Sequence, residues 1–291
     1  MRLVEPEKTV EIIKKNNISF QKRFGQNFLI DGRVLDKIIT AAEIEEGDFV
    51  LEIGPGIGTM TQALAEKATR VVAVEIDKNL IPVLSENLSG CENVEIINAD
   101  VMKLDLTKLV LEKNGGRPVK VVANLPYYIT TPIIMSLFEK KVPMKSATLM
   151  VQKEVAERMM AQPGTKTYGA LSLAVQYCSE PHIAARVPRN CFMPRPDVDS
   201  AVIVLTSHSV PPVSVTDEDL FFNVVRAAFE KRRKTLQNAL SSSARLKLSK
   251  QEAADAIKKA GLPELIRGEA LNISQFATLS EIIGEISREK K

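Results

Sequence analysis

The sequence has few of the residues that hold metals or form disulfides. Its 291 residues include three cysteines and two histidines. The cysteines, Cys91, Cys178 and Cys191, lie far apart without a C-x-x-C pair, and their odd number argues against a disulfide framework, so we expect reduced thiols. His182 and His208 have no cysteine or carboxylate near them at ligand spacing, which argues against a structural zinc site. We therefore expect no metal.

Long apolar runs are also missing. No run approaches the roughly 18 residues that a membrane-spanning helix requires. The first residues, "MRLVEPEKTVEIIKK", carry charges where a signal peptide has an unbroken apolar core. We therefore expect a cytoplasmic protein with no membrane partner. No spare apolar helix face is evident either, so we expect a monomer.

Length and composition favour a soluble protein with two cores. Hydrophobic residues make up 45% of the chain and charged residues 26%, as in soluble globular proteins. A chain of 291 residues suits one large domain with a smaller companion. The net charge of +3 is by itself weak evidence for a nucleic-acid partner. Its excess lies entirely in residues 213–291, which hold 14 basic and 11 acidic side chains.

Apolar runs of strand length alternate with helical patterns from Phe49 to about Ser207, which predicts an α/β fold with helices on both faces of a sheet. We expect strands at residues 49–53, 70–76, 94–98, 119–124, 147–152, 171–177 and 200–206. Amphipathic helices are expected at residues 59–68, 78–88 and 130–140. A linker is predicted at residues 208–215, where two prolines occur, and only helices after it.

A glycine-rich loop follows the first strand. The sequence "VLEIGPGIGTMTQAL" places Gly54, Gly56 and Gly58 between a strand and a helix, where a missing side chain lets the backbone approach a ligand. Alone this is weak evidence, because glycine turns also occur for packing. Glu75 ends the next strand, 17 residues after Gly58, close to the roughly 20 expected for a carboxylate that binds ribose hydroxyls. A solvated strand end is the plainer interpretation of Glu75.

Polar residues end the next two strands as well. Asp100 follows the third strand, where it would accept a hydrogen bond from an adenine amino group, and Asn124 ends the fourth. Ligands of open α/β sheets bind outside the carboxyl ends of the strands, so the four strand ends predict one crevice for a nucleotide-like cofactor. The spacing G-x-G-x-G, in place of G-x-G-x-x-G, argues against NAD as that cofactor.

The fourth strand stops at an amide, a leucine, a proline and a tyrosine. The Asn124 side-chain oxygen and the Leu125 carbonyl would accept the two N–H groups of an adenine amine, while Pro126 stiffens the turn and brings no competing N–H. Tyr127 would offer a face on which the base stacks. An ordinary strand-to-helix turn is the alternative. Tyr128 is expected to pack inside the protein.

The order and content of these motifs resemble one family over nearly the whole chain. "QNFLID", "EIGPGIGTMT", "VEID", "NADVMKLD", "NLPYYITTPI" and "FMPRPDVDSAV" closely resemble the KsgA (RsmA) family of small-subunit (16S) ribosomal RNA adenine N6-dimethyltransferases. "FEKRRKTLQNAL" and "RGEALNISQFATLS" extend the resemblance into the helical part. It implies a class I S-adenosylmethionine-dependent methyltransferase fold, Rossmann-like with a seven-stranded sheet, and a small all-helical C-terminal domain.

The resemblance also implies domains and cofactor contacts. The domains would be an N-terminal helix and cofactor-covering flap at 1–30, the methyltransferase domain at 31–210 and a helical rRNA-binding domain at 211–291. S-adenosylmethionine, which leaves as S-adenosylhomocysteine, would be bound by the motif residues, with Ile76 and Val101 flanking its adenine. These cofactor-binding residues are Gln26, Asn27, Leu29, Gly54, Gly56, Glu75, Ile76, Asp100, Val101 and Asn124.

The target adenine would be held by aromatic residues. Asn124 and Leu125 would orient the amine, on a turn that Pro126 stiffens, and Tyr127 would sandwich the base with Phe192, which the family's F-x-P-x-P motif supplies. No general base is proposed. Phe192 as a core residue is the alternative. The family's products imply dimethylation of two adjacent adenosines near the 3′ end of 16S rRNA, in the 30S subunit or its precursor.

Two basic clusters are candidate RNA contacts. Lys22 and Arg23 belong to the predicted flap. The run from Lys231 to Lys234 is explained most simply as a solvated face, but it lies in the part with the excess charge, so we expect Arg232, Arg233 and Lys234 to contact RNA. Lys140, Lys141 and Lys145 are interpreted as ordinary surface residues.

Two other functions fit the motifs less well. An Erm-type methyltransferase, which modifies 23S rRNA, shares the core motifs, but Leu125 of "NLPY" and the C-terminal segments fit the small-subunit family better. A non-catalytic ribosome assembly factor would use the fold only as a scaffold. The complete set of cofactor motifs favours an active enzyme.

Overall fold

The computed structural model describes residues 3–18, 25–231 and 233–289. The chain forms two compact units. Unit 1 comprises Met1–Ala156 and Glu180–Ser207, and unit 2 comprises Glu157–Ser179 and His208–Lys291. Among the residues described, no helix is long and apolar enough to cross a membrane.

Unit 1 is built on a seven-stranded sheet with the order β4-β3-β2-β5-β6-β9-β7. Neighbouring pairs from β4 to β6 are parallel, and β9 runs antiparallel to β6. This is the sheet that the resemblance predicts. The strands are β2 (Phe49–Ile53), β3 (Arg70–Glu75), β4 (Val94–Asn98), β5 (Val119–Asn124), β6 (Met144–Gln152), β7 (Ser179–Val187) and β9 (Ser200–Ser207).

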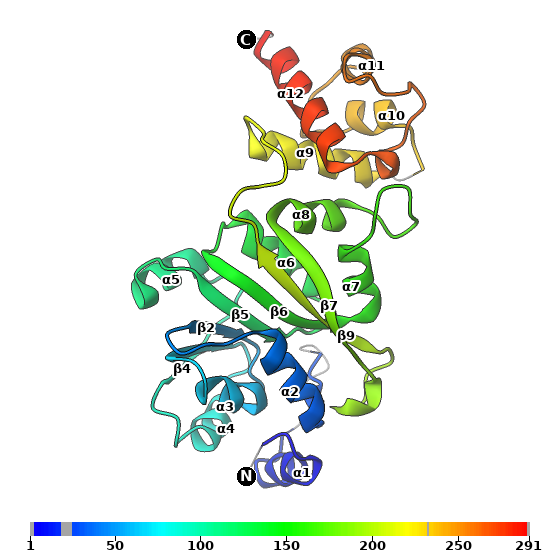
Figure 1. The fold of residues 1–291 in the computed structure, drawn as a ribbon. Coiled ribbons are helices and arrows are strands. Elements are labelled where there is room, and N and C mark those ends of the chain that lie inside the picture. The colour runs from blue at the N-terminus through cyan, green and yellow to red at the C-terminus, as the bar shows by residue number, and fades with distance from the viewer. Residues whose placement is uncertain (1–2, 19–24, 232, 290–291) are drawn as a thin grey trace. The chain divides into compact units, whose positions relative to one another are not determined.

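Helices cover both faces of this sheet. Figure 1 shows α2, α3 and α4 on one side and α5 and α6 on the other. Side chains alternate along a strand, and on one face Val50, Val71 and Val122 pack in a cluster with Leu35 of α2 and Leu64 of α3. The helices are α1 (Pro6–Lys15), α2 (Gly32–Ala41), α3 (Thr59–Ala65), α4 (Ile81–Asn87), α5 (Leu106–Asn114), α6 (Thr130–Glu139) and α7 (Lys153–Met159).

The strand predicted at residues 171–177 is wrong. These residues lie in helix α8 (Ala170–Cys178), which is buried on most of its surface. A helix buried all round and a buried strand give the same uniformly apolar run. The seventh strand is β7, at the edge of the sheet, where Pro181 is tolerated and many side chains are half-buried or exposed.

Unit 2 is helical and has its own core. Tyr177 of α8 packs on Phe221 of α9 with ring centroids 4.9 Å apart, and Leu240 and Phe276 join the same cluster. Helix α8 therefore belongs to this unit, although the sequence assigned residues 157–179 to the larger domain. The predicted boundaries after residues 30 and 210 stay predictions. The other elements are α9 (Glu218–Glu230), α10 (Leu236–Ser241), α11 (Lys250–Lys259), the 3₁₀ turn η3 (Gly268–Ala270) and α12 (Ile273–Glu289).

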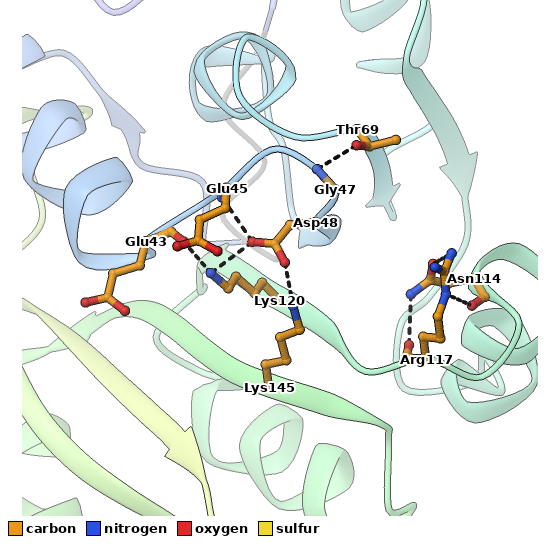
Figure 2. A network of polar contacts seen from close by, with 9 residues as sticks. All are labelled: Glu43, Glu45, Gly47, Asp48, Thr69, Asn114, Arg117, Lys120 and Lys145. Atoms are coloured by element: carbon orange, nitrogen blue, oxygen red, sulfur yellow. Dashed lines mark hydrogen bonds and ion pairs between the residues drawn. The ribbon is translucent and has the colours of Figure 1, made fainter.

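A buried ion-pair network lies just before β2 (Figure 2). The Asp48 carboxylate, 4% exposed, is 2.9 Å from Lys120 Nζ and 2.8 Å from Lys145 Nζ. The Glu45 backbone N–H also donates to it, and Lys120 donates to the Glu43 carbonyl. Lys145 is exposed, as expected of a surface residue, but it is also bound to a buried carboxylate. The network joins the beginnings of β2, β5 and β6.

The first prediction concerns acid stability. Burial opposes ionisation of Asp48, but hydrogen bonds from Lys145, the Glu45 N–H and Lys120 outweigh it and lower its pKa to about 2. As pH falls, the unfolded chain takes up a proton at Asp48 before the folded protein does. The stability that this carboxylate contributes is therefore complete above about pH 4 and is lost as pH falls toward the folded-state pKa. At neutral pH, Asp48→Asn is expected to lower the free energy of unfolding by about 2 to 4 kcal/mol, because Lys120 stays buried without its counter-ion.

Urea unfolding of the purified variant measures this loss. Lys145→Met is the matched control, since that side chain is 55% exposed and Lys120 still neutralises Asp48. Its expected cost is about 1 kcal/mol or less. Equal losses in the two variants would contradict the assigned role of the buried pair.

A second carboxyl group, Glu52 on β2, has its pKa shifted in the opposite direction to that of Asp48. Glu52 is fully buried, and among the described residues neither of its carboxylate oxygens has a partner at hydrogen-bond distance. Burial raises its pKa to about 8, with the neighbouring Glu75 adding to the rise and the nearby Thr61 hydroxyl opposing it. The Glu52 carboxyl is therefore mostly protonated at neutral pH.

The second prediction concerns how the free energy of unfolding depends on pH through the Glu52 carboxyl. Between the ordinary pKa of 4.5 and the folded-state pKa of about 8, the folded protein holds a proton that the unfolded chain releases, so stability falls as pH rises. In the wild-type protein, the free energy of unfolding should therefore fall by an amount on the order of a few kcal/mol between about pH 5 and pH 8. Glu52→Gln, which is neutral at every pH, is expected to lack this fall. Chemical unfolding at both pH values tests it; parallel pH profiles for the two proteins would show that Glu52 does not titrate in this range.

Candidate active site

A cavity opens at the carboxyl ends of the central strands of unit 1. It encloses about 1020 Å³, part of it open to solvent, and its walls come from residues 25–29, the glycine loop, the end of β3, residues 99–101 and the segment after β5. It brings together all ten predicted cofactor-binding residues: Gln26, Asn27, Leu29, Gly54, Gly56, Glu75, Ile76, Asp100, Val101 and Asn124. Leu125, Pro126 and Tyr127 line it too.

The glycine loop forms the floor of the cavity. Gly54 and Gly56 have φ angles of 71° and 62°, in the left-handed region where a side chain is unfavourable. A Cβ atom on Gly56 would lie 3.0 Å from the Phe28 ring, which packs directly against the loop. The loop backbone therefore lines the cavity together with Phe28, whose ring packs on Gly56.

Glu75 is held in a fixed position at the end of β3. It is 5% exposed, so the interpretation as a solvated strand end is wrong. Its carboxylate accepts the Gly56 backbone N–H at 3.1 Å and the Asp77 N–H at 2.8 Å. Burial raises the pKa of Glu75, and the two N–H groups oppose that rise. The strand end thus presents an oriented acceptor beside the glycine loop.

An acceptor between apolar side chains lies further along the cavity. Asp100 accepts the Met102 backbone N–H through Oδ1 at 3.0 Å, which orients its carboxylate. Ile76, 43% exposed, and Val101 line the cavity with it. An apolar slot with an acceptor at its edge suits a flat heteroaromatic ring that carries an amino group.

Residues 26–29 close one side of the cavity. Gln26 Nε2 donates to Asp77 at 2.9 Å. The next residues form β1 (Phe28–Leu29), which pairs antiparallel with β8 (Phe192–Met193) and places Leu29 opposite Phe192. This wall is therefore formed by the Q-N-F-L motif and supported by its pairing with the F-x-P-x-P motif.

The orientation of the Asn124 amide is set by this wall. Asn124 Nδ2 donates to the Asn27 carbonyl at 2.9 Å, so its one remaining strong acceptor, Oδ1, is turned away from that carbonyl. The Leu125 N–H donates to the Met150 carbonyl on β6 at 3.0 Å. These two contacts fix both acceptors, the Asn124 amide oxygen and the Leu125 carbonyl, on rigid backbone.

The two tyrosines after Pro126 differ in exposure. Tyr127 is half-buried and lines the cavity, and burial raises the pKa of its hydroxyl. Tyr128 was expected inside but is 58% exposed. Leu125, at 1% exposure, takes the buried position in this turn. The Tyr128 ring lies instead against Gly25, where an added Cβ would be 3.3 Å from it.

Phe192 does not line the cavity. It is 3% exposed and packs in the cluster that contains Leu29 and Met150. The structure therefore places the ring in the core, which was the alternative interpretation. An aromatic ring next to a strand pairing buries most of its area, which explains this outcome.

The cavity also has lining residues that the sequence did not indicate, and the predicted RNA contacts that the structure describes lie outside its lining. Thr59, Met60 and Leu80 also line the cavity; Thr59 follows the glycine loop directly, whereas nothing in the sequence singles out Leu80. Arg233 and Lys234 are exposed in unit 2. Lys22, Arg23 and Arg232 lie outside the described residues.

Within the part of the chain that the structure describes, no three histidine, cysteine or carboxylate side chains come together as a group that could hold a metal ion. The expectation that the protein needs no metal stays a prediction.

Comparisons with known proteins show the family of the chain. Residues 17–285 match the model of the family described as ribosomal RNA adenine dimethylase. The chain is 60% identical over 284 residues to the ribosomal RNA small subunit methyltransferase A of Lachnoclostridium phytofermentans, covering 97% of this chain and 98% of the relative. It is 49% identical to the protein of the same name from Clostridioides difficile, with 97% of each chain covered.

Two solved structures are similar in fold. A dimethyladenosine transferase from Plasmodium falciparum has a TM-score of 0.74 at 28% identity, covering 90% of this chain and 98% of that one. The 23S rRNA methyltransferase ErmE has a TM-score of 0.64 at 28% identity, covering 89% of this chain and all of that one. With its fold, its strand-end site and a family match over most of its length, the chain belongs to the ribosomal RNA adenine dimethylase family.

Proposed function

We propose that this protein transfers methyl groups from S-adenosylmethionine to N6 of two adjacent adenosines near the 3′ end of 16S rRNA, in the 30S subunit or its precursor. The observation that carries the proposal is the Asn124 amide, whose donor is engaged by the Asn27 carbonyl at 2.9 Å, so that its oxygen is available to an amine. The names of the relatives at 60% and 49% identity support the small-subunit substrate.

The cavity fits S-adenosylmethionine. Glu75, fixed by two backbone N–H groups, suits ribose hydroxyls, and the open backbone at Gly54 and Gly56 suits the methionine part. Asp100 would accept the adenine amino group, with Ile76 and Val101 against the ring. When bound, this cofactor supplies an electrophilic methyl group on a sulfonium.

The chain's own residues orient the target amine. The lone pair of an adenine amine is delocalised into the ring, so the amine must be aligned by acceptors. Asn124 Oδ1 and the Leu125 carbonyl take the two N–H groups. The Pro126 carbonyl accepts the Ile129 N–H and the Thr130 hydroxyl at 3.2 and 3.0 Å, which keeps this turn in place. No general base is assigned.

Tyr127 supports the target base. The residue is half-buried and lines the cavity, and its ring would provide a stacking face for a base taken out of its helix. Because Phe192 is 3% exposed, we assign stacking to Tyr127 and give Phe192 the role of supporting the wall through its pairing with Leu29.

The location, oligomeric state and RNA contacts of the protein are also part of the proposed function. We propose that the protein acts as a cytoplasmic monomer and that the basic residues Arg232, Arg233 and Lys234 contact RNA phosphates. The excess positive charge of residues 213–291 supports this assignment. Lys22 and Arg23 are proposed as further RNA contacts.

The third prediction tests the basic run. Each phosphate contact adds to the salt dependence of binding, so the double variant Arg233→Ala with Lys234→Ala should bind small-subunit RNA more weakly. The slope of log affinity against log salt should become shallower by about 1 to 2, as measured by filter binding at several salt concentrations. Lys258→Ala with Lys259→Ala, an exposed basic pair on α11, is the matched control. A similar change in both double variants would argue against a specific role for the run.

The fourth prediction tests the amide. Asn124→Asp keeps an acceptor of the same shape but loses the donor to the Asn27 carbonyl and places a negative charge beside it. Methyl transfer should fall by about a hundredfold or more; Asn124→Ala should abolish it. Asn114→Asp, at an amide that contacts Arg117 (Figure 2) and does not line the cavity, should keep wild-type activity.

The assay uses labelled S-adenosylmethionine with unmethylated small subunits and, separately, with large-subunit RNA. Mass spectrometry of the nucleosides identifies the product. We expect dimethyladenosine on the small subunit alone. Product on 23S rRNA would favour the Erm-type function, and no product on either RNA would leave only the assembly-factor role. Full activity of Asn124→Asp would overturn the assigned role of the amide.

A further inference from the structure

A hydrogen bond joins the cavity to the first residue of β9. Tyr127 Oη and Ser200 Oγ are 2.6 Å apart, although 73 residues separate them in the sequence. Ser200 is fully buried, whereas Tyr127 is half-buried and lines the cavity. The bond therefore connects a residue that lines the cavity to one that solvent does not reach.

The Ser200 hydroxyl is attached to rigid backbone. Ser200 lies opposite Gln152 in the antiparallel ladder of β6 and β9. One residue earlier, the Asp199 carbonyl accepts the Lys153 N–H at 3.0 Å and its carboxylate accepts the Arg189 N–H at 3.0 Å. The main chain at Ser200 is thus held by its pairing with β6 and by the two hydrogen bonds of Asp199, so its hydroxyl has a fixed position.

Tyr127 is held at its other end by the turn. The Leu125 N–H is bonded to the Met150 carbonyl, and the Pro126 carbonyl accepts Ile129 N–H and Thr130 Oγ1. With the backbone fixed, only the two side-chain torsions of Tyr127 remain free, and the bond to Ser200 restrains both. Burial raises the pKa of the Tyr127 hydroxyl, so the phenol keeps its proton and the bond persists at neutral pH.

We propose that Ser200 is a positioning residue: its hydroxyl holds the Tyr127 ring in the orientation that receives the target adenine. The inference rests on the proposed function, in which that adenine stacks on Tyr127. A tilted ring would carry the base with it and move its amine away from Asn124 Oδ1 and the Leu125 carbonyl. Since the base still stacks on a tilted ring, the loss should fall mainly on the rate at saturation and less on RNA binding.

The proposal is tested with Ser200→Ala, Tyr127→Phe and the double variant. Tyr127→Phe keeps the ring and removes only the hydroxyl. Single-turnover methylation of unmethylated small subunits is measured at saturating RNA and S-adenosylmethionine. Each single variant should be slower by about tenfold, as expected for a misplaced reactant, and the double variant should be no slower than either. The KM for RNA should change by less than about threefold.

Thr148→Val is the matched control. Thr148 is a buried residue of β6, 1% exposed, and its hydroxyl has no hydrogen-bond partner within the described part of the chain. Its removal should leave the methylation rate unchanged. Melting temperatures of all variants show whether any rate change follows from unfolding, and Tyr127→Phe carries the test if Ser200→Ala does not fold.

Three results would overturn the proposal. The first is a rate for Tyr127→Phe or folded Ser200→Ala within about twofold of wild type. The second is a double variant in which the two losses multiply to about a hundredfold, because the two hydroxyls would then act independently. The third is a wild-type protein without activity on small subunits, which would overturn the proposed function itself and is recognised separately, before any variant is compared.

Discussion

The hydrogen bond from Asn124 Nδ2 to the Asn27 carbonyl, 2.9 Å long across 97 residues, decides which atom of the amide faces the cavity. The carbonyl is itself held by its neighbours. Gln26 is bound to Asp77, and Phe28 and Leu29 pair with β8. The same segment supports the cofactor side, because Phe28 packs on the Gly56 backbone whose N–H fixes Glu75. Acceptors for both ligands thus depend on one short wall.

The two ends of the sheet use polar groups differently. Before β2, the Asp48 carboxylate is matched by Lys120 and Lys145, and its hydrogen bonds are made within the protein. At the carboxyl ends, the glycine loop and Asn124 present backbone and amide groups to the cavity. Ion pairs therefore tie the strands together at the end away from the cavity, and the opposite end keeps its acceptors available.

Sequence reasoning located the cavity because parallel strands end at one edge, so glycines, Glu75, Asp100 and Asn124 at strand ends had to lie together. It did not locate contacts made by the backbone or by residues far apart in sequence. The Asn27 carbonyl carries no side-chain signal, and Ser200 pairs with Tyr127 only after β6 and β9 have aligned.

The sequence also did not predict which side chains are buried. The exposed side chain of Tyr128 and the buried one of Phe192 have similar chemistry, so only the geometry of the turn and of the β1–β8 pair separates them. Helix α8 was predicted as a strand because a helix buried on most sides lacks the polar face that marks an amphipathic one. Strand β7 was not predicted. The ion pair of the exposed Lys145 was not predicted because its partner Asp48 is 97 residues away.

Unit 1 is interrupted by Glu157–Ser179, which belongs to unit 2. A ribosome that has released the chain only as far as Ala156 has delivered Asn27 and Asn124 but not β8, the partner of β1, nor β9, the partner of β6. At that point the wall beside Asn124 has no opposing strand, and β6 exposes an unpaired edge of the kind that invites association with other chains. During synthesis, the methyl-transfer pocket is therefore completed late, by the segment that also supplies Ser200.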